Sequence, residues 1–329
     1  MEGKLKQLTE KKHRLDKYRP LPPELVKNLE DWFRVELTYT SNAIEGNTLT
    51  RQETALVVEK GITVEGKSLK EHLEAINHAQ ALEFIKTLIK KKREELKEVD
   101  ILDIHKIIIA KIDDTNAGRY RTVPVRIAGS TVVMPNAIKV PDLMKEFIKW
   151  LTSPNKNHAI KISANAHYKL VSIHPFVDGN GRTARLLMNL LLMQNGYPPA
   201  LIRKEDRRRY INSIEQGQLK GNLQDYYEII LEAVERSLDI YLEALEPKET
   251  KEGVKMNELL KIGELAKETG ETVYTVRFWT KEGLLIVKDF TKGGYQLYEP
   301  SMIERVKEIR RLQEEKRITI TEIKERIKK

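Results

Sequence analysis

One short segment brings together residue types that can hold and activate a phosphate group. Residues 173–192 read IHPFVDGNGRTARLLMNLLL, so a His-Pro pair and an acid precede Gly-Asn-Gly-Arg, and an apolar helical run follows at once. A helix that begins at glycines exposes unpaired backbone N–H groups and the positive end of its dipole. Glycine also allows positive φ and a close approach of the backbone to an anion. The segment therefore predicts a phosphate-binding loop at a helix N-terminus.

The charged and titratable side chains around this loop have offsets that suit nucleotide chemistry. Arg182 and Arg185 are three residues apart, so both can reach one anion from the first turn of the helix. Asp178 offers a hard oxygen ligand for Mg²⁺, and His174 is the candidate general base because it titrates near neutrality. The alternative is that Gly-Asn-Gly only turns a corner and that His174 satisfies a carbonyl. The acid and the two arginines at fixed offsets favour the phosphate site.

The segment resembles the signature of the Fic family, H-P-F-x-(D/E)-G-N-G-R-x-x-R, at every position. The matching residues are His174, Pro175, Phe176, Asp178, Gly179, Asn180, Gly181, Arg182 and Arg185. The resemblance extends over roughly residues 20–245. It implies a helical-bundle core and a nucleotidyltransferase that moves AMP from ATP to a Ser, Thr or Tyr hydroxyl of a target protein, with the chain itself as a further candidate target.

The resemblance also implies a role for each residue of the loop. It makes His174 the base that deprotonates the attacking hydroxyl, and it makes Asp178 the ligand of an Mg²⁺ ion that bridges the α- and β-phosphates. Asn180 and the N–H groups of Gly179 and Gly181 would hold the α-phosphate. Arg182 and Arg185 would bind the outer phosphates. The ring of Phe176 would anchor the loop in the core.

A second motif, TSNAIEGN at 40–47, resembles the inhibitory motif of Fic proteins, (S/T)-x-x-x-E-(G/N). Ser41 and Glu45 are one helical turn apart, and Gly46 is expected to end the helix. A carboxylate at a helix C-terminus faces the negative pole of the dipole, which favours a functional interpretation of Glu45. The resemblance implies that Glu45 pairs with Arg185 in the place of the γ-phosphate. We therefore expect a mostly inactive enzyme. A reverse reaction, in which Glu45 helps to remove AMP from the target, is an alternative.

Hydrophobic periodicity predicts a mainly helical fold around these motifs. Helices are expected over 22–46, 68–96, 99–112, 140–152 and 223–245. Between them, alternation around Val123, Val125 and Ile127 with a turn at Gly129-Ser130 predicts a β-hairpin over Val123–Val133. The Fic resemblance implies that this hairpin is a flap that docks the target as an added strand. On pattern alone, a hairpin that only closes the helical core is equally possible.

The last part of the chain predicts a separate winged helix-turn-helix module. A helix over Ile262–Thr269, a turn at Gly270 and a second helix over Thr272–Glu282 precede an alternating segment with a turn at Gly293-Gly294. Modules of this kind bind either DNA or proteins. The spacing of IGELA, T-x-R, GLL and GY-x-x-Y resembles the DNA-binding domain of the MerR family. That resemblance implies double-stranded DNA as a partner, with contacts from Thr275, Arg277, Lys281, Lys292 and Tyr295, although Gln296 stands where the family usually has Arg.

These signals together give the expected organisation. We predict an N-terminal helical region at 1–100 with the inhibitory motif, a Fic catalytic core at 101–245, a polar linker at 246–258 and a MerR-like module at 259–329. A lone module of the MerR type binds DNA weakly, so dimerisation would have to come from the Fic portion or would not occur. The alternatives to the transferase are a nucleotide-sensing DNA-binding regulator with little transfer activity, and an enzyme that moves another nucleotide such as UMP.

Composition excludes several classes of protein. The chain of 329 residues has no cysteine, which excludes disulfides, thiolate zinc sites and a Cys nucleophile. No apolar run is long enough to span a bilayer and the N-terminus has no apolar signal core, so we expect no membrane insertion and a cytoplasmic protein. The net charge of +9 is compatible with phosphate-bearing partners.

Overall fold

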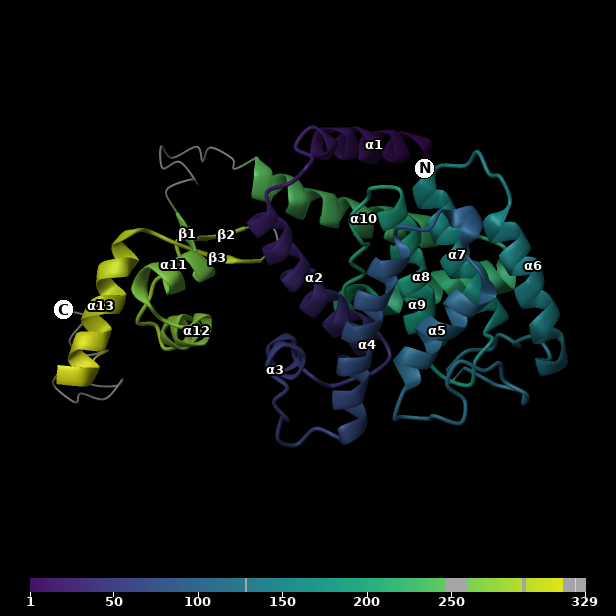
Figure 1. Ribbon diagram of the computed structural model, residues 1–329, viewed down its shortest axis with the longest axis horizontal. Coiled ribbons are helices and arrows are strands. Elements are labelled where there is room, and N and C mark those ends of the chain that lie inside the picture. The colour runs from purple at the N-terminus through teal and green to yellow at the C-terminus, as the bar shows by residue number, and fades with distance from the viewer. Residues whose placement is uncertain (128, 247–258, 292–293, 316–322, 324–329) are drawn as a thin grey trace. The chain divides into compact units, whose positions relative to one another are not determined.

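The chain forms two compact units, Met1–Tyr241 and Leu242–Lys329. A computed structural model describes residues 1–127, 129–246, 259–291, 294–315 and 323 (Figure 1). The predicted mainly helical fold is confirmed, and a small sheet is present in the second unit. Of the predicted linker at 246–258, all but Glu246 lies outside the described residues, and the predicted division of the first unit near residue 100 stays a prediction. Across the described part of the chain, no helix is both long and apolar enough to cross a bilayer.

The first unit is a bundle of α-helices, with one long connection between α5 and α6 that includes the loop at 119–136. The helices are α1 Glu2–Asp16, α2 Pro23–Ile44, α3 Arg51–Lys60, α4 Leu69–Leu88, α5 Glu98–Ile109, α6 Val140–Thr152, α7 Ala159–Ile173, α8 Asn180–Gln194, α9 Arg207–Lys220 and α10 Gln224–Leu245, of which the part after Tyr241 belongs to the second unit. Three short 3₁₀ turns lie at Arg93–Glu95, Ala137–Lys139 and Lys204–Asp206. The long helix expected over 68–96 ends at Leu88, because Gln194 of α8 donates to the carbonyls of Leu88 and Lys91 and so caps its end.

Helix α8 is the centre of this bundle. It packs against α2, α4, α5 and α7, as Figure 1 also shows. Its apolar side chains are buried on every side, with Leu186, Leu187 and Leu190 through Leu192 almost fully enclosed. A helix that is apolar all round is stable only inside a core. Burial therefore fixes the position of α8, and with it the position of the loop that enters its N-terminus.

The segment predicted as a β-hairpin is an extended loop instead. The turn forms at the expected place, where Ser130 N–H donates to Ile127 O and Gly129 has φ 79°. No strand is present in the described residues 119–127 and 129–136. The physical reason is that the buried Arg121 side chain donates to Val123 O and Pro135 O, so a side chain connects the two arms in place of a backbone ladder. Pro124 in addition has no N–H to give to a ladder.

The second unit has the predicted winged helix-turn-helix architecture. Its elements are β1 Leu260–Lys261, α11 Ile262–Thr269, α12 Val273–Lys281, β2 Asp289–Phe290, β3 Gln296–Tyr298 and α13 Ser301–Glu315. The strands pair antiparallel in the order β1-β3-β2. Gly270 adopts the left-handed turn between the helices, and Thr272 caps α12 by accepting from Thr275 N–H. Trp279, Leu265 and Tyr298 lie in its own buried core.

Candidate active site

A tight loop connects α7 to α8 and carries the predicted catalytic residues. Helix α7 ends at His174, which has φ 51° and ψ 60°, a left-handed conformation that is uncommon for a residue other than glycine. Gly179 has φ 78°, and α8 begins directly after it. Phe176 is fully buried and stacks on the ring of His105 with 3.6 Å between ring centroids. The loop is thus fixed at both ends and in its middle.

The side chain of Asn180 supports the loop from within. Its Oδ1 accepts from Phe176 N–H and its Nδ2 donates to Phe176 O, both at 2.9 Å. This double contact holds the amide that the family resemblance assigns to the α-phosphate, and it leaves the backbone N–H of Asn180 and the second N–H of Nδ2 for an anion. The first N–H groups of a helix have no carbonyl partner within it. Those of Asn180, Gly181 and Arg182 therefore lack a carbonyl partner within α8 and are available to an anion.

The surroundings of His174 determine which of its ring nitrogens carries a proton. Its Nδ1 lies 3.3 Å from Val171 O, and because a carbonyl only accepts, Nδ1 carries the proton and Nε2 keeps its lone pair. Burial lowers the pKa of His174, while Val171 O raises it and the Arg121 charge lowers it further. The imidazole is therefore neutral at pH 7, which is the form that a general base requires.

Asp178 fits a cation that arrives together with phosphates. Its Oδ1 accepts from Gly179 N–H at 2.6 Å, its Oδ2 lies 3.9 Å from Lys70 Nζ, and its side chain is 53% exposed. In the residues that the structure describes, no group of three His, Cys, Asp or Glu side chains could hold a metal alone. Mg²⁺ is commonly held by one or two carboxylates plus substrate phosphates. A half-exposed carboxylate beside a helix N-terminus matches that mode.

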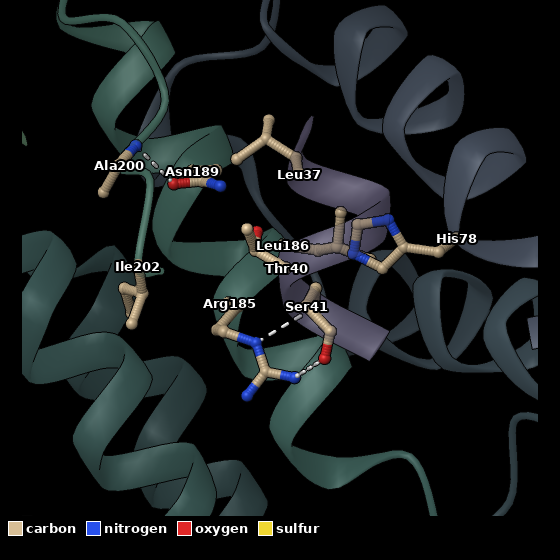
Figure 2. Close-up of a pocket in the computed structure, with 9 residues that line it drawn as sticks. All are labelled: Leu37, Thr40, Ser41, His78, Arg185, Leu186, Asn189, Ala200 and Ile202. Carbon is tan, nitrogen blue, oxygen red and sulfur yellow. Dashed lines mark hydrogen bonds between the residues drawn. The ribbon is translucent and has the colours of Figure 1, made fainter. Parts of the chain in front are cut away.

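Arg185 contacts the motif at 40–47, with a buried contact to Ser41 and a part-buried one to Glu45. Arg185 Nε donates to Ser41 Oγ at 3.0 Å and Nη2 donates to Ser41 O at 2.9 Å, as Figure 2 shows. Nη2 also donates to Glu45 Oε1 at 2.6 Å. The Arg185 side chain is 6% exposed and that of Glu45 is 37% exposed. Helix α2 ends at Ile44, with Glu45 as its C-cap and Gly46 at φ 101°, so the predicted end of this helix is confirmed within two residues.

Known proteins share this arrangement of helices. The model of the Fic/DOC family matches residues 95–192. The solved structure of Fic-1 (residues 134–508) from C. elegans is 34% identical with a TM-score of 0.67, and it covers 74% of this chain and 72% of that one. A Fic domain-containing signalling protein from Bacteroides thetaiotaomicron is 30% identical with the same TM-score, over 75% of this chain and all of the other. The chain belongs to the Fic family.

Curated relatives carry the name protein adenylyltransferase Fic. The protein from Nematostella vectensis is 40% identical over 206 residues, which are 62% of this chain and 48% of that protein. The protein from Aedes aegypti is 37% identical over 219 residues, which are 66% of this chain and 43% of that protein. This chain therefore spans about half the length of the curated relatives it matches. Its residues 260–329 match a separate model, the MerR HTH family regulatory protein.

Gly181 of the Fic loop allows Glu45 to approach. A Cβ atom built at this position would lie 2.3 Å from Glu45 Oε1 and 3.0 Å from Arg185 Nη1. The glycine therefore leaves room for whichever anion faces Arg185, here the Glu45 carboxylate. The same space is available to a phosphate oxygen once the carboxylate has left.

Arg182 faces a different helix from Arg185. Its guanidinium is 2% exposed, with Nη1 3.3 Å from Glu74 Oε1 on α4 and Nη2 3.5 Å from Asp178 Oδ1. The two arginines are therefore not directed at a single anion as the spacing predicted. Arg182 Nε is buried without a hydrogen-bond partner among the described residues, a donor that a phosphate oxygen could satisfy.

A chain of buried polar groups lies behind Arg185. Tyr226 Oη donates to Ala164 O and accepts from His167 Nδ1 at 2.8 Å, so His167 Nε2 accepts from Tyr210 Oη at 2.6 Å. Burial raises the pKa of the Tyr210 hydroxyl, and the nearby Arg185 charge lowers it. Burial lowers the pKa of His167 to about 3, so this ring is neutral. The ring of Tyr210 is buried, so it offers no free face for a base to stack on.

Three residues that position the loop were not predicted from the sequence. His105 accepts from Gly118 N–H at Nδ1 and donates from Nε2 to Asp178 O at 3.0 Å. Burial lowers the pKa of His105 to about 4, which keeps it in this neutral form. Glu74 holds Arg182, and Arg121 holds the carbonyl of His174. The sequence offered one signal for His105, which is a lone histidine within an apolar run. It offered no signal for Glu74 or Arg121.

In the second unit, the predicted DNA contacts are partly placed. Arg277 and Lys281 are exposed and one turn apart on α12. Thr275 is half-buried with its Oγ1 2.8 Å from Thr272 Oγ1, and Tyr295 is half-buried beside the wing. Lys292 lies outside the described residues. The basic pair on α12 is therefore the part of the predicted set that is free to meet phosphates.

Proposed function

We propose that this Fic protein is an adenylyltransferase that moves AMP from ATP to a Ser, Thr or Tyr hydroxyl of a target protein. The observation that carries the proposal is a neutral His174 with a free Nε2, six residues before Asn180, where the N-terminal N–H groups of α8 begin. A base beside an anion-binding helix end suits in-line attack at phosphorus, which demands alignment and charge neutralisation. The name of the curated relatives supports the choice of AMP.

In the proposed reaction His174 Nε2 takes the proton of the target hydroxyl while its oxygen attacks the α-phosphorus. A P–O bond to the target forms, the bond to the β-phosphate oxygen breaks, and pyrophosphate leaves. The N–H groups of α8 would hold the α-phosphate, and the unpartnered Nε of Arg182 would be a further donor to the phosphates. Asp178 would hold Mg²⁺, which supplies further neutralisation of phosphate charge when bound.

We propose further that Glu45 holds the enzyme in an inactive state. The contact of its carboxylate with Arg185 at 2.6 Å supports this, since the guanidinium cannot serve a γ-phosphate while it is engaged. The clearance at Gly181 adds support, because the carboxylate fills the space nearest to the loop. ATP would then bind without the alignment that transfer requires.

Labelled ATP tests both parts. The wild-type chain, Glu45→Gly and Glu45→Gly/His174→Ala are incubated with Mg²⁺ and ATP labelled at the α-phosphate, alone and with cell lysate. We expect strong labelling of protein by Glu45→Gly alone, with UTP and GTP much poorer donors. If the wild-type chain labels as strongly as Glu45→Gly, Glu45 does not hold the enzyme inactive. If the double variant without His174 still labels protein, His174 is not the base. Release of label after washing would identify AMP removal.

The second candidate function is DNA-bound regulation, favoured by the exposed Arg277 and Lys281 on α12. We propose that this module binds double-stranded DNA, with a homodimer supplying a second copy. Arg277→Ala and Lys281→Ala should each reduce the slope of log affinity against log salt by roughly 1. Fluorescence anisotropy with mixed DNA and sedimentation of the full chain check both statements. A wild-type chain that leaves DNA unbound at low salt contradicts the proposal.

A further inference from the structure

Arg121 is a buried cation whose contacts in the described structure are carbonyl oxygens. It is 2% exposed. Its Nε donates to His174 O at 2.8 Å, its Nη1 to Val123 O at 3.1 Å and its Nη2 to Pro135 O at 2.6 Å. Its backbone N–H donates to Pro175 O at 2.9 Å. One side chain thus joins the catalytic loop to both arms of the loop at 119–136.

The contacts fall where the catalytic backbone needs support. His174 has positive φ, and a residue other than glycine keeps such a conformation only where its surroundings hold it. Arg121 binds the carbonyls on both sides of the bond between His174 and Pro175. The planar fork of an arginine can hold three acceptors in fixed directions, which a lysine ammonium on a flexible stem cannot reproduce.

We propose that Arg121 is a positioning residue that holds His174 in its left-handed turn and fixes both arms of the 119–136 loop to it. The inference rests on the proposed transfer reaction in one respect, that His174 is the base. A target segment that contacts the exposed Val123 or Val133 on these arms would then lie at a constant distance from the imidazole. Arg121 itself touches no reacting atom.

A purely structural role for Arg121 would predict a loss of stability and nothing specific to His174. The charged groups that act on His174 are Arg121, Glu45 and Asp178. The cation lowers the pKa of the imidazole, and the two carboxylates raise it. Loss of the Arg121 charge should therefore raise the pKa of His174, whereas a lysine at this position should leave it nearly unchanged. Charge and geometry can thus be separated by two substitutions.

The test compares Arg121→Lys and Arg121→Met in the Glu45→Gly background. Because a small misplacement of a reacting group costs on the order of 100-fold, we expect Arg121→Lys to lose about that factor in kcat with the KM for ATP within about twofold. Arg121→Met should lose at least as much, and the acid limb of its pH–rate profile should move to higher pH. Arg93 is the matched control, since it also donates to two carbonyls, Leu151 O and Ser153 O, away from the site. Arg93→Lys should keep kcat within about twofold.

An NMR titration of His174 in the same proteins gives a readout that needs no transfer. The His174 signal, assigned by its loss in His174→Asn, should titrate at higher pH in Arg121→Met than in the parent or in Arg121→Lys. If Arg121→Lys keeps full kcat, or if His174 titrates alike in all three proteins, the inference is overturned. Absence of labelling in every protein would instead refute the proposed function. Should Arg121→Met fail to fold, Arg121→Lys still decides the matter through kcat.

Discussion

Replacing Glu45 by glutamine tests whether its charge, apart from its shape, keeps the enzyme inactive. The amide can still accept from Arg185, so the substitution removes the ion pair and leaves the geometry. Two charges about 4 Å apart attract by about 4 kcal/mol at an effective dielectric constant near 20. Glu45 is 37% exposed, so solvent reduces this value, and Arg185 keeps Ser41 as a partner. We therefore expect the free energy of unfolding to fall by about 1–2 kcal/mol.

The same interaction sets the expected rise in activity. If the pair with Arg185 is what favours the inactive state, its loss can shift the balance between inactive and active states by no more than its own free energy. A change of about 1–2 kcal/mol corresponds to roughly a 5–30-fold higher labelling rate. Glu45→Gly, which also vacates the space beside Gly181, should exceed this value.

Two assays on the same samples provide the check. Urea denaturation gives the free energy of unfolding, and the initial rate of label incorporation at saturating ATP gives the activity. Glu232→Gln is the matched control, since Glu232 accepts from Arg209 at 2.8 Å on the exposed surface and should change neither quantity measurably. A Glu45→Gln protein that loses stability as expected but labels at the wild-type rate would refute the argument, because the pair would then exist without acting as a brake.

Three further predictions follow from particular contacts. Gly181→Ala introduces a Cβ 2.3 Å from the Glu45 carboxylate and should raise the labelling rate of the wild-type chain severalfold, while adding nothing in the Glu45→Gly background. Tyr210→Phe removes the hydroxyl that donates to the buried ring of His167 and should cost about 1–3 kcal/mol in urea denaturation. His105 and His167 have folded pKa values of about 4 and about 3, below the usual 6.5, so their stabilisation is present above pH 6.5 and declines as pH falls toward 4. Each of these two histidines should lower the free energy of unfolding by about 2 kcal/mol at pH 5 relative to pH 8.

The controls for these predictions come from the same helices. Tyr227→Phe removes a hydroxyl that donates to Asn165 outside the buried chain, and it should cost less than Tyr210→Phe. Equal losses would show that Tyr210 has no special role. Stability that is the same at pH 5 and pH 8 would contradict the assigned pKa values. A Gly181→Ala chain that labels no faster than the wild type would show that the carboxylate moves aside without activating the enzyme.

The parts of the site that are contiguous in sequence could be predicted, because one loop and one helix start contain them. The positions of His174, Asp178 and Gly179 all follow from the segment at 173–192. The contact between Glu45 and Arg185, which are 140 residues apart, was predicted through family resemblance and was found in the structure. Periodicity could not have supplied it, since it reports which face of a helix is buried and not which partner covers it.

The remaining features arise from packing between distant segments. Arg121 and Glu74 look like ordinary charged residues in the sequence, and their roles appear only when the loop at 119–136 and helix α4 are placed against the catalytic loop. The prediction of a hairpin was wrong because it could not take account of a side-chain contact of this kind. The alternation of Val123 and Val125 fits a strand. In the structure, however, the carbonyls of Val123 and Pro135 accept from the Arg121 side chain in place of a ladder N–H.

The most direct test of the whole account is a crystal structure of the Glu45→Gly chain with Mg²⁺ and a non-hydrolysable ATP analogue. We expect the α-phosphate on the first N–H groups of α8, the metal ion beside Asp178, and His174 Nε2 facing the α-phosphorus. A nucleotide bound elsewhere, or an imidazole turned away from that phosphorus, would contradict the account.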